Sequence, residues 1–296
     1  MGKPEDSTPR ETSGSEVAPP PPYTEVVQNA QGEGSAPPNY NSHAPVAIAI
    51  SPYQPFPQVL DAHYQWKSAS VFHLGDDANK RLFAVSVHTG WGGKGPGRPG
   101  MILHNGPTDK DLMLAAAGEE GEKASTYSPN SIITLPALSG GAPGQYCTEV
   151  MRASKNMDTV VFRFSIEVGQ KELHREDFEW RKSKGDEVKD FVESPWKCGF
   201  KLVRLSTHQN GGSSSQKAAG TEQEVVAVFA WSSTWSVMTP FKVQFRGSGR
   251  DGALGERFTL MAVITSLRLW WLKQQGRTSE NTIAAGEAGL VPWATG

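Results

Sequence analysis

Two glycine-rich segments match the pattern G-x-G-x-x-G, which in nucleotide-binding proteins holds a phosphate at the start of a helix. The first, Gly95–Gly100, leads into an expected strand and contains two prolines, which lack the backbone N–H that a phosphate needs. The second, Gly247–Gly252, precedes an expected helix, but neither a following strand nor an acidic ribose partner completes a βαβ unit. We interpret the first as a hairpin loop and the second as a tight connection into a helix.

Three cations, Arg181, Lys182 and Lys184, stand close together in a segment that carries both signs of charge. Cations around a turn can hold the phosphate groups of acidic lipids, and each contributes about 1 kcal/mol near an anionic membrane. Lys94 and Arg98, in the first glycine-rich segment, are further candidates. Because acidic residues flank the three cations, a solvated hairpin tip with local ion pairs is the alternative interpretation.

Two copies of the pattern Pro-Pro-x-Tyr lie near the start of the chain. They consist of Pro20, Pro21 and Tyr23, and of Pro37, Pro38 and Tyr40. A preformed polyproline turn loses little entropy on docking, and WW domains bind such segments in aromatic grooves. The two tyrosines are 17 positions apart, a spacing that suits tandem WW domains, such as those of HECT-type ubiquitin ligases. Proline bias in a tail is the alternative explanation.

The sequence patterns of known catalytic sites are missing. There is no G-x-S-x-G elbow, no H-E-x-x-H and no phosphate-binding G-K-[ST]. The seven histidines are scattered without ligand spacing, and Cys147 and Cys198 are not spaced as metal ligands. We therefore expect a protein that is not an enzyme and that has no metal and no cofactor. Catalytic residues that converge only in space leave no such pattern.

The elements that must position these residues begin after a tail. Residues 1–60 are dominated by Pro, Ser, Glu, Gln, Asn and Gly and contain two basic and six acidic residues, so we expect them to be disordered. Residues 61–296 carry a net charge of +2, without a Lys/Arg run interleaved with aromatic residues. This composition argues against nucleic-acid binding. We expect a second flexible tail over residues 276–296.

Between residues 61 and 246, short apolar runs rich in β-branched residues alternate with Gly, Pro, Asn and Asp. Such runs predict eleven strands, and no helix is expected before the segment that follows them. The predicted strands are Ser70–Leu74, Leu82–His88, Gly100–His104, Leu112–Ala117, Ser131–Leu135, Tyr146–Arg152, Asp158–Val168, Asp177–Arg181, Cys198–Leu205, Glu224–Trp231 and Phe241–Arg246.

The segment Phe258–Leu272 determines how these strands must be arranged. At 100° per residue its large apolar side chains point in every direction, so a helix over residues 256–274 must be buried all round. Its expected core residues are Phe258, Leu260, Ile264, Leu267 and Trp271. The segment reaches about 22 Å, which is short of the roughly 30 Å of a bilayer core. A closed barrel of strands around the helix would supply the surroundings that it needs.

Four segments carry a resemblance to a known family. They are LFAVSVHTGWGG, PGMILHNGPTDKDLMLAAA, REDFEWRKSKGDEVK and GERFTLMAVITSLRLWW. In these the chain resembles a fungal group of the tubby-like superfamily, which also holds the plant LURP-one-related proteins and the phospholipid scramblases. The resemblance covers most of residues 61–275 and implies a barrel of about twelve strands around a hydrophobic C-terminal helix. It also implies phosphoinositide binding, and scramblases have similar proline-rich tails.

Together these observations predict a mainly β protein, a closed antiparallel barrel enclosing a hydrophobic helix, with a disordered N-terminal tail. We expect a non-catalytic adaptor that recruits WW-domain proteins through its tail. Because no secretory signal opens the sequence, we expect it in the cytoplasm, and peripheral association with acidic phospholipids of the plasma membrane is a further hypothesis. The alternatives are a scramblase-like lipid transporter and a hydrolase whose site the sequence does not reveal.

Overall fold

The computed structural model describes residues 54–64, 70–76, 80–88, 100–120, 128–138, 145–156, 159–189, 197–205, 223–232 and 240–289. These residues belong to one compact unit, Ala49–Gly296. The two Pro-Pro-x-Tyr segments, Lys94 and Arg98 lie outside the described residues.

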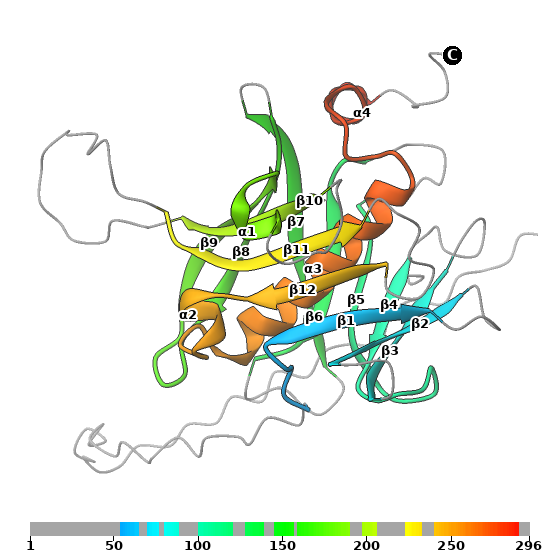
Figure 1. The fold of residues 1–296 in the computed structure, drawn as a ribbon, viewed down its shortest axis with the longest axis vertical. Helices are drawn as coiled ribbons and strands as arrows, with labels where there is room; N and C mark the ends of the chain where they lie inside the picture. The colour runs from blue at the N-terminus through cyan, green and yellow to red at the C-terminus, as the bar shows by residue number, and fades with distance from the viewer. Residues whose placement is uncertain are drawn as a thin grey trace, which may run out of the picture. The chain divides into compact units, whose positions relative to one another are not determined.

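Twelve antiparallel strands form a closed barrel (Figure 1). In chain order they are β1 (Val59–Tyr64), β2 (Val71–Gly75), β3 (Arg81–Val87), β4 (Met101–His104), β5 (Met113–Glu119), β6 (Ser131–Pro136), β7 (Tyr146–Asn156), β8 (Thr159–Val168), β9 (His174–Ser183), β10 (Lys197–Leu205), β11 (Val225–Ser232) and β12 (Phe241–Phe245). Each strand pairs with its neighbours in sequence, and β1 pairs with β12 with Leu60 opposite Val243. This last pairing removes the free edges that an open sheet would leave.

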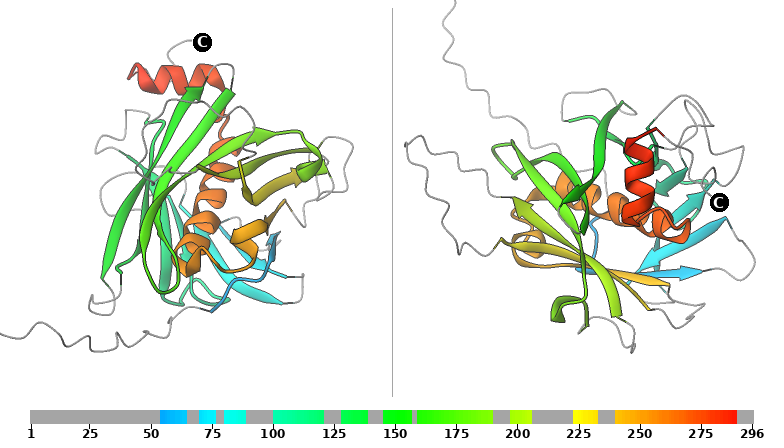
Figure 2. Two further views of the ribbon diagram at one scale, coloured as in Figure 1. Left: turned by 90° about the vertical axis from the view of Figure 1, so that its left-hand side faces the viewer. Right: turned by 90° about the horizontal axis from the view of Figure 1, so that it is seen from above.

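Four helices complete the described structure: α1 (Asp186–Lys189), α2 (Gly247–Arg250), α3 (Gly255–Gln274) and α4 (Glu280–Glu287). Helix α3 runs through the barrel, with α2 at one end and α4 at the other (Figure 2). We call these the α2 end and the α4 end of the barrel.

The strands form because their side chains alternate between the lumen and the outside. In β12, Phe241, Val243 and Phe245 are buried, while the two residues between them are half-buried. The same alternation is present in β6, where Ile133 and Leu135 face the core. Because successive side chains of a strand point to opposite faces, each such strand contributes one apolar face to the lumen.

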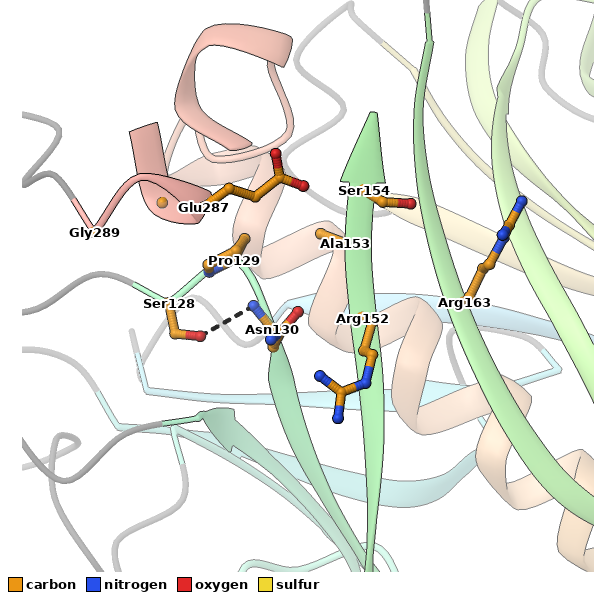
Figure 3. Close-up of a pocket in the computed structure, with 10 residues that line it drawn as sticks. Ser128, Pro129, Asn130, Arg152, Ala153, Ser154, Arg163, Glu287 and Gly289 are labelled. Atoms are coloured by element: carbon orange, nitrogen blue, oxygen red, sulfur yellow. Dashed lines mark hydrogen bonds between the residues drawn. The ribbon is translucent and has the colours of Figure 1, made fainter. Parts of the chain in front are cut away.

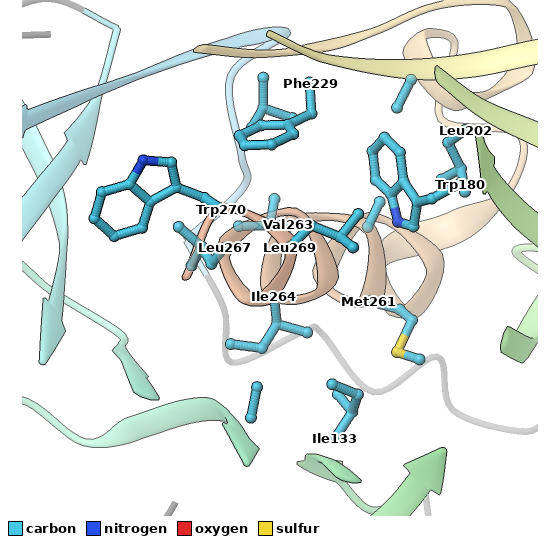
Figure 4. Packing of buried hydrophobic residues seen from close by; sticks show 14 of the residues in the cluster. Ile133, Trp180, Leu202, Phe229, Met261, Val263, Ile264, Leu267, Leu269 and Trp270 are labelled. Atoms are coloured by element: carbon cyan, nitrogen blue, oxygen red, sulfur yellow. The ribbon is translucent and has the colours of Figure 1, made fainter. Parts of the chain in front are cut away.

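Helix α3 fills this lumen and is surrounded by strands (Figure 4). Its large apolar side chains are at most 2% exposed from Phe258 to Leu272, with the exception of Trp271, which is half-buried. Trp180, on β9, and Ile133, on β6, lie on different sides of the helix. The predicted burial on all sides is therefore confirmed, and only Trp271 among the expected core residues is less buried than predicted.

The polar side chains of α3 are bonded inside the core. The Thr265 hydroxyl donates to the carbonyl of Met261 at 2.7 Å and accepts from the indole N–H of Trp180 at 3.0 Å. Arg268 is only 2% exposed, and its Nε donates to the hydroxyl of Ser131 at 2.9 Å. A buried polar group that lacked its partner would cost about 1–3 kcal/mol, so these bonds also fix the rotation of the helix in the lumen.

Two glycines allow the chain to turn into the barrel before α3. Gly255 has a φ of +82°, and a Cβ atom there would lie 2.6 Å from the carbonyl oxygen of Gly169. At Gly249, in α2, a Cβ atom would lie 2.4 Å from the carbonyl oxygen of Val226. The second G-x-G-x-x-G match is therefore a close-packed connection, as predicted, in which glycine is required by backbone contact.

Comparison with the expected elements shows which of them the sequence did not reveal. All eleven predicted strands are present with small shifts at their ends. The structure adds β1, which begins at Val59 within the segment that we expected to be part of the N-terminal tail. The expectation of no helix before the central one was wrong, because the one-turn helices α1 and α2 precede α3. The structure also adds α4 in the expected C-terminal tail, where Ile283 is fully buried and Ser279 caps the helix by accepting from the backbone N–H of Thr282.

Candidate functional site

The structure separates the cations that the sequence placed together. Arg181 and Lys182 are neighbours on β9, so their side chains point to opposite faces. The Arg181 guanidinium lies outside the barrel, where Nε donates to Glu179 at 2.5 Å and Nη1 donates to Gln223 at 2.6 Å. Lys182 pairs in register with Phe200, a core residue, and so lies on the lumen side. Lys184 follows the strand and is exposed.

Lys182 is instead close to the C-terminal end of α3. Burial is the main cause that lowers the pKa of Lys273; Cys198 has the opposite effect, and the charge of Lys182 lowers this pKa further. The Lys273 ammonium group lies 4.7 Å from the ring centre of Trp231. Two lysines and an aromatic ring thus meet where α3 leaves the barrel, a combination that attracts an anion carrying an apolar part.

A second group of polar residues lies inside the barrel at the α2 end. Arg204 donates to both carboxylate oxygens of Glu176 at 2.6 Å, and Glu176 also contacts the His174 ring at 2.7 Å. Burial raises the pKa of Glu176, but the hydrogen bonds and charges of Arg204 and His174 outweigh this effect, so the pKa lies below its ordinary value. The network has no nucleophile and serves to cover this end of the apolar core.

A serine–histidine pair lies on the outside of the barrel between β3 and β4. The Ser86 hydroxyl and His104 Nε2 are 2.9 Å apart, and Nδ1 is 2.9 Å from the backbone carbonyl of Asp111. Because a carbonyl only accepts, Nδ1 carries the proton in the neutral ring and Nε2 accepts from the serine, as in a nucleophile–base pair. Ser86 and His104 are 8% and 7% exposed, however, so a substrate cannot reach them and the pair is a packed polar contact.

The described surface contains a groove between α4 and the outer face of the barrel, which we call the α4 groove (Figure 3). Its volume is about 630 Å³, within the range of roughly 300–1,000 Å³ that is usual for small-molecule sites. The lining residues are Ser128, Pro129, Asn130, Arg152, Ala153, Ser154, Arg163, Gly286, Glu287 and Gly289.

Two arginines dominate the barrel side of the α4 groove. Arg152 on β7 and Arg163 on β8 are directly opposite each other in the strand register. Arg163 Nε is bonded to Glu179, a carboxylate that it shares with Arg181. Arg152 has no acidic partner among the described residues. Like charges directly opposite on neighbouring strands are destabilising by themselves, so this face of the groove favours an anion.

Helix α4 is held firmly against the barrel and forms the other side of the groove. Ile283 packs into the core, and Lys155 Nζ lies 3.0 Å from the carboxylate of Glu280. Arg277, just before α4, is bonded to Glu119 of β5. Glu287, in the last turn, extends toward β7 (Figure 3) and has no cationic partner within the described part of the chain.

Sequence reasoning found none of the α4 groove. Its residues come from two strands, from the segment before β6 and from the end of a helix that was not predicted, and only the strand register brings Arg152 beside Arg163. The separation of Arg181 from Lys182, by contrast, had a signal in the sequence, because adjacent residues of a predicted strand point to opposite faces.

In the part of the chain that the structure describes, no three His, Cys, Asp or Glu side chains are arranged to hold a metal ion. Over the same residues, every helix is too short or too polar to cross a bilayer.

Comparisons of the chain with models of known protein families, with curated proteins and with solved structures found no match.

Proposed function

We propose that the protein is a non-catalytic binding module, an adaptor that uses its outer surface and its N-terminal segment to bind partners. The observation that carries this proposal is the occupied lumen: α3 fills the interior of the barrel with side chains that are almost completely buried. A barrel of this kind differs from one that encloses a ligand, because its own helix takes the place that a ligand would occupy.

Membership of the tubby-like superfamily is part of this proposal. It is supported by the four segments quoted above and by the closed twelve-strand barrel around a hydrophobic helix, which is the architecture that the resemblance implies. Under this proposal the protein acts in the cytoplasm and associates peripherally with acidic phospholipids. Lys182 and Lys184 are the better candidates for lipid contact, because Arg181 is already bonded to Glu179 and Gln223.

The first partners that we propose are WW-domain proteins, including HECT-type ubiquitin ligases. Tyr23 and Tyr40 would anchor two separate WW domains, with the prolines before each tyrosine packed in the aromatic groove. As a flexible coil the linker between the two motifs spans about 20–25 Å, which allows both to engage a tandem pair of WW domains. The two motifs together should then bind about 10- to 100-fold more tightly than either motif alone.

The test uses a peptide of residues 15–45 and a protein with two tandem WW domains, with affinity measured by titration calorimetry. Tyr23→Ala and Tyr40→Ala should each reduce affinity to that of a single site, and the double variant should not bind. Pro19→Ala is the matched control, because Pro19 lies outside the Pro-Pro-x-Tyr pattern. Undiminished binding by the double variant across a panel of WW domains would mean that the matches reflect composition alone.

A further inference from the structure

The α4 groove carries opposite charges on its two sides. Arg152 and Ser154 are two residues apart on β7, so they belong to the same face of that strand. Arg163 adds a second guanidinium, 51% exposed, of which Nε is bonded to Glu179. Arginine presents its N–H groups in a planar fork that matches a carboxylate or a phosphate. This side of the groove is therefore suited to an oxyanion.

Across the groove, the negative charge of Glu287 is not neutralised by any described residue. Glu287 is exposed in the last turn of α4, where the helix dipole adds further negative potential. An oxyanion alone would be attracted by Arg152 and repelled by Glu287. A ligand that also carries an ammonium group, at a suitable distance from its anionic group, would be attracted at both positions.

The two charged side chains come from different elements, β7 and α4. Arg152 and Glu287 form no ion pair with each other, although both line the same groove. The burial of Ile283 and the ion pair between Lys155 and Glu280 fix α4 on the barrel. The fold consequently sets the backbone positions of Arg152 and Glu287, and their exposed side chains reach a ligand from these positions.

We propose that the α4 groove binds a small zwitterion, with its carboxylate or phosphate at Arg152 and Ser154 and its ammonium group at Glu287. This inference goes beyond the proposed adaptor function, which uses other residues. Because the two side chains start from fixed backbone positions, the site favours ligands whose own charges are far enough apart to reach both.

The experiment uses a series of ω-amino acids of increasing length: glycine, β-alanine, γ-aminobutyrate, δ-aminovalerate and ε-aminocaproate. Binding to the full chain is measured by titration calorimetry and by ligand-observed NMR. Affinity should pass through a maximum at one chain length. The carboxylate and the amine of that same length should each bind at least about tenfold more weakly, because each keeps only one charge-assisted interaction.

Two variants test the residues. Arg152→Gln and Glu287→Gln should each lower the affinity for the best ω-amino acid by about tenfold or more. Arg250→Gln and Glu172→Gln are matched controls, because both residues are exposed and lie at the α2 end of the barrel. The controls should bind as the parent does, and unchanged melting temperatures would show that all four variants are folded.

A third variant inverts the specificity. Glu287→Lys places a cation on each side of the groove, so it should bind the dicarboxylate of matching length more tightly than the ω-amino acid. The proposal is overturned if no member of the series shows saturable binding in the millimolar range, or if affinity does not depend on chain length. It is also overturned if Glu287→Gln has no effect, because the site would then recognise only an anion.

Discussion

The strongest prediction from the fold concerns Leu267, near the centre of the helix in the lumen. Its side chain is fully buried, so Leu267→Ala removes apolar contacts and leaves a cavity that the surrounding strands cannot close. Substitutions of this kind cost about 2–5 kcal/mol, against a total free energy of unfolding of about 5–15 kcal/mol. For a domain of this size the expected fall in melting temperature is about 4–20 °C.

The matched control is Leu112→Ala. Leu112 is 81% exposed in the connection between β4 and β5, so the same chemical change should alter the free energy of unfolding by less than about 0.5 kcal/mol. Both variants can be compared with the parent by urea denaturation followed by tryptophan fluorescence. Leu267→Asp, which would place an unpaired carboxylate in the lumen, should prevent folding. Equal stability of the two alanine variants would refute the occupied lumen on which the proposed function depends.

Two further predictions concern charged residues. Glu176 has a pKa below its ordinary value of 4.5 because of Arg204 and His174, so its contribution to stability is present above that value and is lost as pH falls through the pKa of the folded state. Arg204→Gln should therefore reduce the free energy of unfolding at neutral pH and flatten the decline of that free energy below about pH 5. Denaturant unfolding at a series of pH values would measure both effects. An unchanged decline at acidic pH would contradict the role of this pair. For membranes, Lys182→Gln should weaken binding to vesicles containing acidic phospholipids by about fivefold, whereas Arg181→Gln should change it less, since one charge near the surface contributes about 1 kcal/mol. Equal losses in sedimentation assays would contradict the division of these two side chains between the faces of β9.

The sequence was most informative where one kind of side chain dominated a whole element. The apolar residues of Phe258–Leu272 have no polar stripe, and this alone requires a helix enclosed by the rest of the chain. Strand β1 was missed because Asp61 and His63 interrupt its apolar pattern, and in the structure Asp61 is paired with Lys242 of β12. Helix α4 was missed because its eight residues contain only one large apolar side chain, Ile283.

The candidate site on the outer surface was harder to predict than the fold, for a physical reason. Lumen residues are selected by burial, which leaves a periodic pattern along each strand. Outer residues such as Arg152 and Arg163 become neighbours only through the register of β7 and β8, and Glu287 joins them only because α4 folds back on the barrel. Each of these contacts depends on pairings that no local pattern in the chain records.

The order of the elements along the chain has a consequence for how the protein is made. The ribosome synthesises the strands first and the helix that fills them almost last, and β1 cannot pair with β12 until more than three-quarters of the chain exists. At about 5–20 residues per second, roughly 10–40 s separate the synthesis of β1 from that of the end of α3. During this interval the apolar faces of the strands have nothing to cover them, so the nascent chain is a natural client for chaperones that bind exposed hydrophobic segments. A ribosome that stops before Gly255 would release the strands without the helix that fills their lumen. Such a product would be handled by cellular quality control.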